Sequence, residues 1–291
     1  MAIGAIHIAW LSELHKRGQF RGPGCVIDLG PQDVQVARNL LAGSLPTSPE
    51  RTALMDGMFS AGPDRPDAQC QKAFYALYGF DGYESLDSED PRATYKVDLN
   101  LPAPDMPEFE VVTNFGTTEH VCNIGEAFKT VHRLTKPGGL SLHAVPCFAF
   151  INHGFYGINP NVLVEIALAN RYEIVDFSYY DNAYVRNVQL DRGGLDGFRL
   201  DALPIRLEDM EDTTTFMSKV VDRFYANLVS KETCTIILDH DRSKTGPYPG
   251  KEHLLCFVFD LVFFAMRRPL DRSSFVFPMQ RTQGVVVPKG A

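Results

Sequence analysis

Apolar runs alternate with segments of helical periodicity along the first two-thirds of the chain. The continuous or alternating runs predict strands at residues 26–29, 83–86, 94–97, 111–115, 140–145 and 172–180. The intervening segments predict helices at residues 3–16, 33–41, 68–78, 124–134 and 160–170. The stretch 44–67 is rich in Pro, Gly, Ser and Asp and predicts a loop. This alternation indicates an α/β fold built on a doubly wound, mostly parallel sheet.

The last third has a different pattern. Apolar residues recur every fourth position over residues 213–230 and predict an amphipathic helix, with Phe216, Val220, Phe224 and Leu228 on one face. Residues 235–238 and 254–266 predict two further strands. We expect one domain over residues 1–291, in which residues 1–22 form an N-terminal helical region and residues 182–253 an insertion before the last strand.

Composition narrows the class of protein. The chain has 291 residues, of which 45% are hydrophobic and 22% charged, as in ordinary globular proteins. A net charge of −8 argues against a dedicated nucleic-acid binder. No apolar run is long enough to span a bilayer. Its six cysteines are scattered and form no Cys-x-x-Cys pair, as is typical of reduced thiols in a cytoplasmic protein.

Polar residues stand where successive strands end. Asp28-Leu29-Gly30 closes the first strand, and a glycine there lets the backbone approach a ligand closely. Asp87 and Asp98 follow the next two strands, in positions from which a carboxylate can accept hydrogen bonds from ribose hydroxyls or an adenine amino group. In α/β sheets these strand ends form the ligand crevice. An ordinary turn would also favour Asp at such positions.

A second motif follows the fourth strand. Asn114-Phe115-Gly116 forms a tight turn, Glu119-His120 follows it, and a Lys-Pro-Gly-Gly turn at residues 136–139 precedes the fifth strand. Over residues 24–180 this order of elements resembles the class I S-adenosylmethionine-dependent methyltransferases. The resemblance implies a Rossmann-like, seven-stranded sheet with an antiparallel last strand, and S-adenosyl-L-methionine as the cofactor.

The resemblance also implies a set of cofactor contacts. Asp28 and Gly30 would lie by the methionine part, Asp87 by the ribose, Asp98 and Leu99 by the adenine, and Asn114 on the methionine or substrate side. Two features depart from the family pattern: the glycine-rich loop is reduced to Gly30, and the gap between Asp28 and Asp87 is unusually long.

Two histidines are candidate general bases, because imidazole titrates near neutrality. They are His120, after the fourth strand, and His153, in the aromatic segment 150–160 that should rim the acceptor pocket. Some methyltransferases hold a divalent ion with Glu-x-x-Glu-His, but Gly116 stands here where the first carboxylate would be. We therefore expect no metal, and expect Glu119 and His120 to support the start of a helix.

Three functions follow from these observations. The first is transfer of a methyl group to an oxygen or nitrogen of a small-molecule acceptor of the sugar or natural-product type. The second is a non-catalytic scaffold that keeps the fold, which the reduced glycine loop leaves open. The third is an NAD-dependent oxidoreductase, which the missing G-x-G-x-x-G disfavours. We expect residues 182–253 to shape the acceptor pocket or an interface between two copies in a homodimer.

Overall fold

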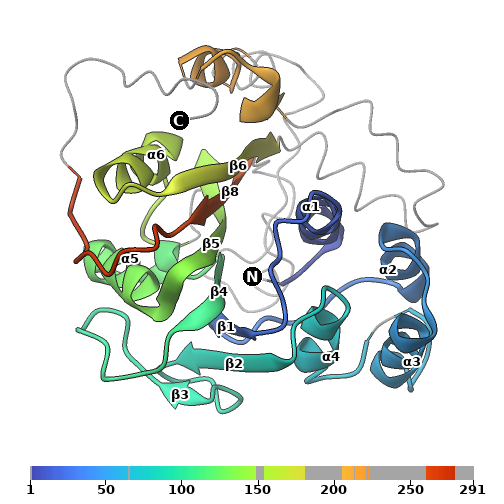
Figure 1. Cartoon of the computed structure of the whole chain (residues 1–291). Coiled ribbons are helices and arrows are strands. Elements are labelled where there is room, and N and C mark those ends of the chain that lie inside the picture. The colour runs from blue at the N-terminus through green and yellow to red at the C-terminus, as the bar shows by residue number, and fades with distance from the viewer. Residues whose placement is uncertain are drawn as a thin grey trace, which may run out of the picture.

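A single mixed sheet runs through the part of the chain that the computed structural model describes, residues 2–64, 66–148, 154–180, 205–212, 214–220, 222 and 260–278 (Figure 1). Within these residues the strands follow the order β3-β2-β1-β4-β5-β8-β6-β7. Their bounds are β1 Cys25–Leu29, β2 Gly82–Asp87, β3 Tyr95–Lys96, β4 Phe109–Phe115, β5 Thr135–Phe148, β6 Glu173–Tyr180, β7 Ile205–Arg206 and β8 Asp260–Arg267.

The pairing directions confirm the predicted architecture. Strands β1 to β5 pair in parallel, and β8 pairs antiparallel with both β5 and β6. The two-residue β7 adds an eighth strand at the edge, beyond the seven that the family resemblance implies. Because β1 to β5 are parallel, their carboxyl ends share one edge of the sheet.

Helices cover both faces of this sheet. They are α1 Ala5–Lys16, α2 Arg38–Ser44, α3 Pro49–Met58, α4 Gln71–Ala76, α5 Ile124–Leu134 and α6 Pro160–Ala169, with short 3-10 turns η1 Thr118–His120 and η3 Leu207–Asp209. One buried cluster joins α1 to α4 with the sheet, and two others pack α5 and α6 against the opposite face. Figure 1 shows these two groups of helices on opposite sides. Helix α5 has the bounds that its periodicity predicts.

The predicted helix 33–41 is wrong in its first half, since α2 begins only at Arg38. The chain before it is extended and forms a parallel bridge between Val34 and Ile3. The Ile3 amide donates to the Asp33 carbonyl at 2.8 Å, and the Gln35 amide donates to the Ile3 carbonyl at 2.9 Å. Backbone groups used in this bridge cannot also form helical hydrogen bonds. The bridge holds the start of α1 beside the loop after β1.

The predicted loop 44–67 is also wrong, because it contains α3. Ser48 caps this helix by accepting a hydrogen bond from the Arg51 amide at 3.2 Å, and Pro49 stands in the first turn. Serine at the cap and proline just after it are typical of a helix start. The polar, proline-rich composition hid a ten-residue helix.

Part of the C-terminal third lies outside the described residues. Residues 214–220 are helical, and Phe216 and Val220 are fully buried there, as the pattern predicts. Phe224, Leu228 and the predicted strand 235–238 are not described, nor is most of the insertion 182–253. No helix in the described ranges has the length and hydropathy needed to cross a bilayer.

Candidate functional site

The carboxyl ends of β1, β2 and β4 meet around Gly30. This residue adopts φ 75°, a conformation that glycine enters without strain, and its amide donates to the Leu86 carbonyl at 2.8 Å. A Cβ at Gly30 would lie 3.3 Å from Thr117 Oγ1 and 3.7 Å from both Asp87 Oδ2 and Gln32 Nε2. Polar atoms from three segments therefore surround the position that a Cβ would occupy at residue 30, and glycine is the residue that leaves this position empty.

Asp28 lies beneath this position, on the face that α4 covers. Its buried carboxylate accepts hydrogen bonds from Tyr75 Oη at 2.6 Å, Tyr83 Oη at 3.1 Å and Thr113 Oγ1. Burial raises its pKa to about 6, although the three hydroxyl donors act in the opposite direction. Asp28 thus joins β1, β2, β4 and α4 close to the ends of the parallel strands, and its predicted contact with a cofactor stays a prediction.

Asp87 reaches the same place despite the long gap that separates it from Asp28 in sequence. Its Oδ1 accepts hydrogen bonds from the Glu89 amide at 2.7 Å and the Asp90 amide at 2.9 Å, which shapes the turn after β2. Its Oδ2 is the oxygen near Gly30. One oxygen of Asp87 therefore holds the turn, and the other lies beside Gly30.

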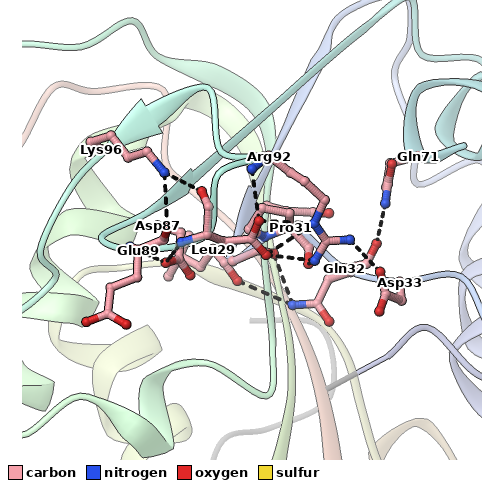
Figure 2. Close-up of polar contacts among 12 residues, drawn as sticks. Leu29, Pro31, Gln32, Asp33, Gln71, Asp87, Glu89, Arg92 and Lys96 are labelled. Carbon is pink, nitrogen blue, oxygen red and sulfur yellow. Dashed lines mark hydrogen bonds and ion pairs between the residues drawn. The ribbon is translucent and has the colours of Figure 1, made fainter. Parts of the chain in front are cut away.

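Arg92 connects the loops after β1 and β2 (Figure 2). Its guanidinium pairs with Asp33, donates to the Pro31 carbonyl at 3.3 Å, and binds Asp90 through Nε at 3.0 Å and Nη2 at 2.7 Å.

Lys96 donates to the Glu89 carbonyl at 3.4 Å on the same rim. Arg92 pairs with the carboxylates of Asp33 and Asp90, and the loop after β2 also carries those of Asp87 and Glu89. The rim therefore carries an excess of negative charge, which suits a cationic ligand.

Asp98 and Leu99 follow β3, and they differ in their exposure to solvent. The Asp98 carboxylate is exposed and accepts hydrogen bonds from the Asn100 amide at 2.9 Å and Asn100 Nδ2 at 2.8 Å. Leu99 is buried in the cluster beneath α5. The Asn123 amide donates to Asn100 Oδ1 at 2.9 Å, so this loop borders the start of α5. The adenine contacts assigned to both residues stay predictions.

Asn114 is fully buried at the end of β4. Its Oδ1 accepts from the Thr118 amide at 3.1 Å, and its Nδ2 donates to Thr118 Oγ1 at 2.8 Å and lies 3.1 Å from His143 Nδ1. Because strand residues alternate between faces, Asn114 lies on the α5 face, opposite Thr113 and Asp28. The amide holds the turn after β4, and its predicted ligand contact stays a prediction.

The structure describes one of the two candidate general bases. His120 lies in η1 with 46% of its side chain exposed, and its Nε2 is 4.0 Å from Glu119 Oε1. Glu119 is buried, and its carbonyl accepts from the Phe155 amide at 2.7 Å. His153 lies outside the described residues. Among the residues that are described, no group of three or more His, Cys, Asp or Glu is placed to hold a metal ion.

Sequence reasoning missed several residues of this edge. Thr117, Gln32 and Arg92 belong to no motif, and only the fold brings them to the ends of β1 and β2. The threonine pair after Gly116 was a usable signal, since hydroxyls in a turn that follows a strand often face a ligand. His7 on α1, whose surroundings are described below, gave no sequence signal at all.

The strand order and the antiparallel β8 settle the architecture. The chain has a Rossmann-like, methyltransferase-type fold. No family model matches the chain, and no curated protein matches it. Solved structures with a similar fold were found, at low similarity.

One is the 1,6-didemethyltoxoflavin-N1-methyltransferase of Burkholderia thailandensis with bound 1,6-didemethyltoxoflavin and S-adenosylhomocysteine, 12% identical, covering 91% of this chain and 78% of that one at a TM-score of 0.39. Another is phosphoethanolamine N-methyltransferase 2 of Haemonchus contortus with S-adenosyl-L-methionine, 16% identical, covering 89% and 52% at 0.42. A third is a methyltransferase of Geobacter sulfurreducens with S-adenosyl-L-homocysteine, 12% identical, covering 89% and 90% at 0.39. Similarities this low identify neither a substrate nor a reaction for this chain.

Proposed function

We propose that this protein binds S-adenosyl-L-methionine at the carboxyl ends of β1, β2 and β4 and transfers its methyl group to an oxygen or nitrogen of a small acceptor. The observation that carries the proposal is the position beside Gly30, where Thr117 Oγ1, Asp87 Oδ2 and Gln32 Nε2 lie within 4 Å of an absent Cβ. Such a position lets a ligand approach the backbone and meet hydrogen-bond partners at once.

Charge supports the sulfonium cofactor over a dinucleotide. A pyrophosphate binds best at a helix N-terminus directly after the first strand. Here no helix begins after β1 until α2 at Arg38, and Asp33 stands in the loop. The carboxylate of Asp87 has no cationic partner among the described residues and would repel a phosphate but attract the sulfonium or amino group of adenosylmethionine, whereas Asp33 and Asp90 already pair with Arg92.

The residues fit distinct parts of such a ligand. Asp87 Oδ2 would accept hydrogen bonds from ribose hydroxyls, and the exposed Asp98 carboxylate would face the adenine amino group. Gly30 would admit the methionine part. The bound sulfonium supplies an activated methyl and a good leaving group, so the protein's main work is alignment, and alignment supplies several kcal/mol. His120 or His153 would accept the proton that the acceptor loses.

Binding calorimetry with adenosylmethionine and S-adenosylhomocysteine tests this site. Gly30→Ala should weaken both ligands about tenfold or more, and Gly30→Val should abolish binding, because the new side chain fills the position between Thr117 and Asp87. Gly18→Ala is the matched control: Gly18 has φ 68°, but nothing lies within 4 Å of its Cβ position. Equal affinities for the Gly30 variants and wild type would contradict the placement.

Native mass spectrometry of the purified protein separates the alternatives. A co-purified adenosylmethionine or its demethylated product supports the methyltransferase. A bound dinucleotide would support an oxidoreductase, and the absence of any ligand together with no affinity for adenosylmethionine would support a scaffold.

We place the acceptor side of the pocket in residues 182–253, and propose a cytoplasmic enzyme whose acceptor is a sugar or natural product rather than a nucleic acid. The double substitution Tyr248→Ala with Lys251→Ala should raise the acceptor KM and leave adenosylmethionine affinity unchanged. A change confined to sedimentation would instead make this segment an interface between the copies of a homodimer.

A further inference from the structure

The first turn of α1 lies at the same edge of the sheet as Gly30. The bridge between Ile3 and Val34 fixes residue 3 beside the loop after β1, one residue before the Gly4 cap of α1. On the other side, the His7 ring packs against Phe115, the last residue of β4, with ring centroids 5.2 Å apart. Thr117, two residues farther, reaches the Gly30 position. The start of α1 therefore lies near the ends of β1 and β4, and its His7 ring also packs against Phe263 of β8, with ring centroids 5.1 Å apart.

This helix start is positively polarised. The first amides of an α-helix have no partner within the helix, and the helix dipole adds partial positive charge there. Gly4 has no side chain to cap the turn, the His7 ring accepts the Gly4 amide, and the first turn contains no acidic residue that would neutralise it. The helix has 12 residues, so this dipole is fully developed.

His7 supplies a second, independent sign of a ligand. The residue is only 4% exposed, and its Nδ1 accepts a hydrogen bond from the Gly4 amide at 3.3 Å. The proton of the neutral ring is therefore on Nε2, because Nδ1 uses its lone pair. Nε2 is buried and has no hydrogen-bond partner among the described residues. A buried donor without an acceptor costs about 1–3 kcal/mol, so native proteins rarely keep one without a use.

We propose, on the basis of the function proposed above, that the first turn of α1 and the Nε2–H of His7 bind the amino-acid carboxylate of adenosylmethionine. The loop after β1 has no helix start of its own before α2 begins at Arg38. Helix α1 would supply, beside the loop after β1, the positive helix end that this loop does not contain before Arg38. Burial lowers the pKa of His7 to about 3, so at neutral pH the ring acts as an uncharged donor.

Two ligands that differ in the amino-acid part provide the test. S-adenosylhomocysteine carries the carboxylate, and 5′-methylthioadenosine shares the adenosine and thioether but lacks the amino-acid group. In calorimetry, His7→Leu should bind S-adenosylhomocysteine about tenfold more weakly than wild type and 5′-methylthioadenosine equally well. His7→Gln keeps an N–H donor and should recover most of the affinity. His132→Leu, at a second histidine that is 4% exposed, should change neither affinity.

A carboxamide analogue of S-adenosylhomocysteine tests the same contact from the side of the ligand. Its comparison with the acid can be made on wild type alone, so it does not depend on whether a variant folds. Wild type should bind the carboxamide about tenfold more weakly than the acid, whereas His7→Leu should discriminate far less between them. Equal affinity of wild type and His7→Leu for S-adenosylhomocysteine would overturn the carboxylate site. An equal loss of affinity for S-adenosylhomocysteine and 5′-methylthioadenosine in His7→Leu would overturn it too. If wild type binds neither adenosine ligand, the proposed function itself fails.

Discussion

Trp10 on α1 donates its indole Nε1–H to Asp176 Oδ2 on β6, across 2.7 Å. Arg17, just after the end of the same helix, binds the other oxygen of this carboxylate at 2.9 Å. Ser178 Oγ also donates to Oδ2, at 2.8 Å. One buried carboxylate therefore holds two points of the N-terminal helix against the far half of the sheet, and so fixes the direction in which α1 approaches the crevice.

Asp176→Ala should destabilise the protein by about 3 kcal/mol, because it removes the acceptor of a buried indole and leaves Arg17 without its main partner. Trp10 is the sole tryptophan of the chain, so its fluorescence reports directly on this contact during urea unfolding. The control is Asp271→Ala, which removes an exposed ion pair with Arg171 and should lower the stability far less than Asp176→Ala. Similar losses in the two variants would contradict a special role for Asp176.

Asp28→Asn should change how stability depends on pH. The pKa of Asp28 rises from 3.8 in the unfolded chain to about 6 in the folded protein, so the folded state binds the extra proton between these values. This group therefore stabilises the fold at low pH, and its contribution is lost as pH rises through 6. The shift of about two pH units corresponds to about 3 kcal/mol.

Urea unfolding of wild type and Asp28→Asn between pH 4 and pH 7 measures this effect. The variant should gain about 2 kcal/mol relative to wild type from the low to the high end of that range, because part of the effect lies below pH 4. A difference that stays constant with pH would mean that Asp28 ionises in the folded protein as it does in the unfolded chain.

The buried histidines should act in the opposite direction. Burial lowers the pKa of both His7 and His143 from 6.5 to about 3, so the unfolded chain binds more protons below pH 6.5. The stability that these neutral rings contribute is present above pH 6.5 and is lost as the pH falls toward 3. His143→Leu should reduce the slope of unfolding free energy against pH by about 1.4 kcal/mol per pH unit near pH 5. An unchanged slope in denaturant titrations would show that His143 takes up its proton in the folded state.

The two candidate bases make separable predictions. If His153 takes the acceptor proton, His153→Ala should lower kcat by about 100-fold or more, with adenosylmethionine affinity unchanged. His120→Ala should then have little effect on kcat. A large loss of kcat in His120→Ala, with little change in His153→Ala, would assign the proton transfer to His120. Parallel calorimetry on each variant separates loss of chemistry from loss of binding.

Turnover should not need a divalent ion. Gly116 lacks the carboxylate that a Glu-x-x-Glu-His site would use, so His120 and Glu119 form an incomplete set. Initial rates in EDTA and in buffer alone should agree within about twofold. Activity that disappears in the chelator and returns with Mg²⁺ or Mn²⁺ would contradict this prediction.

Local patterns predicted the elements whose signals lie within their own sequence. Helix α5 has a complete apolar face, and the strands that precede Gly30, Asp87 and Gly116 are apolar runs, so their common edge followed from the parallel topology. The helix expected from residue 33 failed because Val34 pairs with Ile3, about thirty positions away. Such a partner cannot be read from a local window.

The same distinction between local patterns and tertiary partners holds for the site. The meeting of Gly30 and Asp87 was expected from strand order, whereas the three hydroxyls on Asp28 come from α4, β2 and β4 and carry no joint signature. His7 is ordinary in its own segment. Only its tertiary setting, next to Phe115 with an unsatisfied Nε2 in the described part of the chain, singles it out.

The place of β8 has a consequence for synthesis of the chain. This strand lies between β5 and β6 but is separated from β6 by about eighty residues of chain, from Tyr180 to Asp260. While the ribosome makes that stretch, β5 and β6 both lack the neighbour that will join them, and their free edges can pair with other nascent chains. Slowed translation after residue 180, or a chaperone that shields β5, should therefore change the yield of folded protein more than any comparable event earlier in the chain.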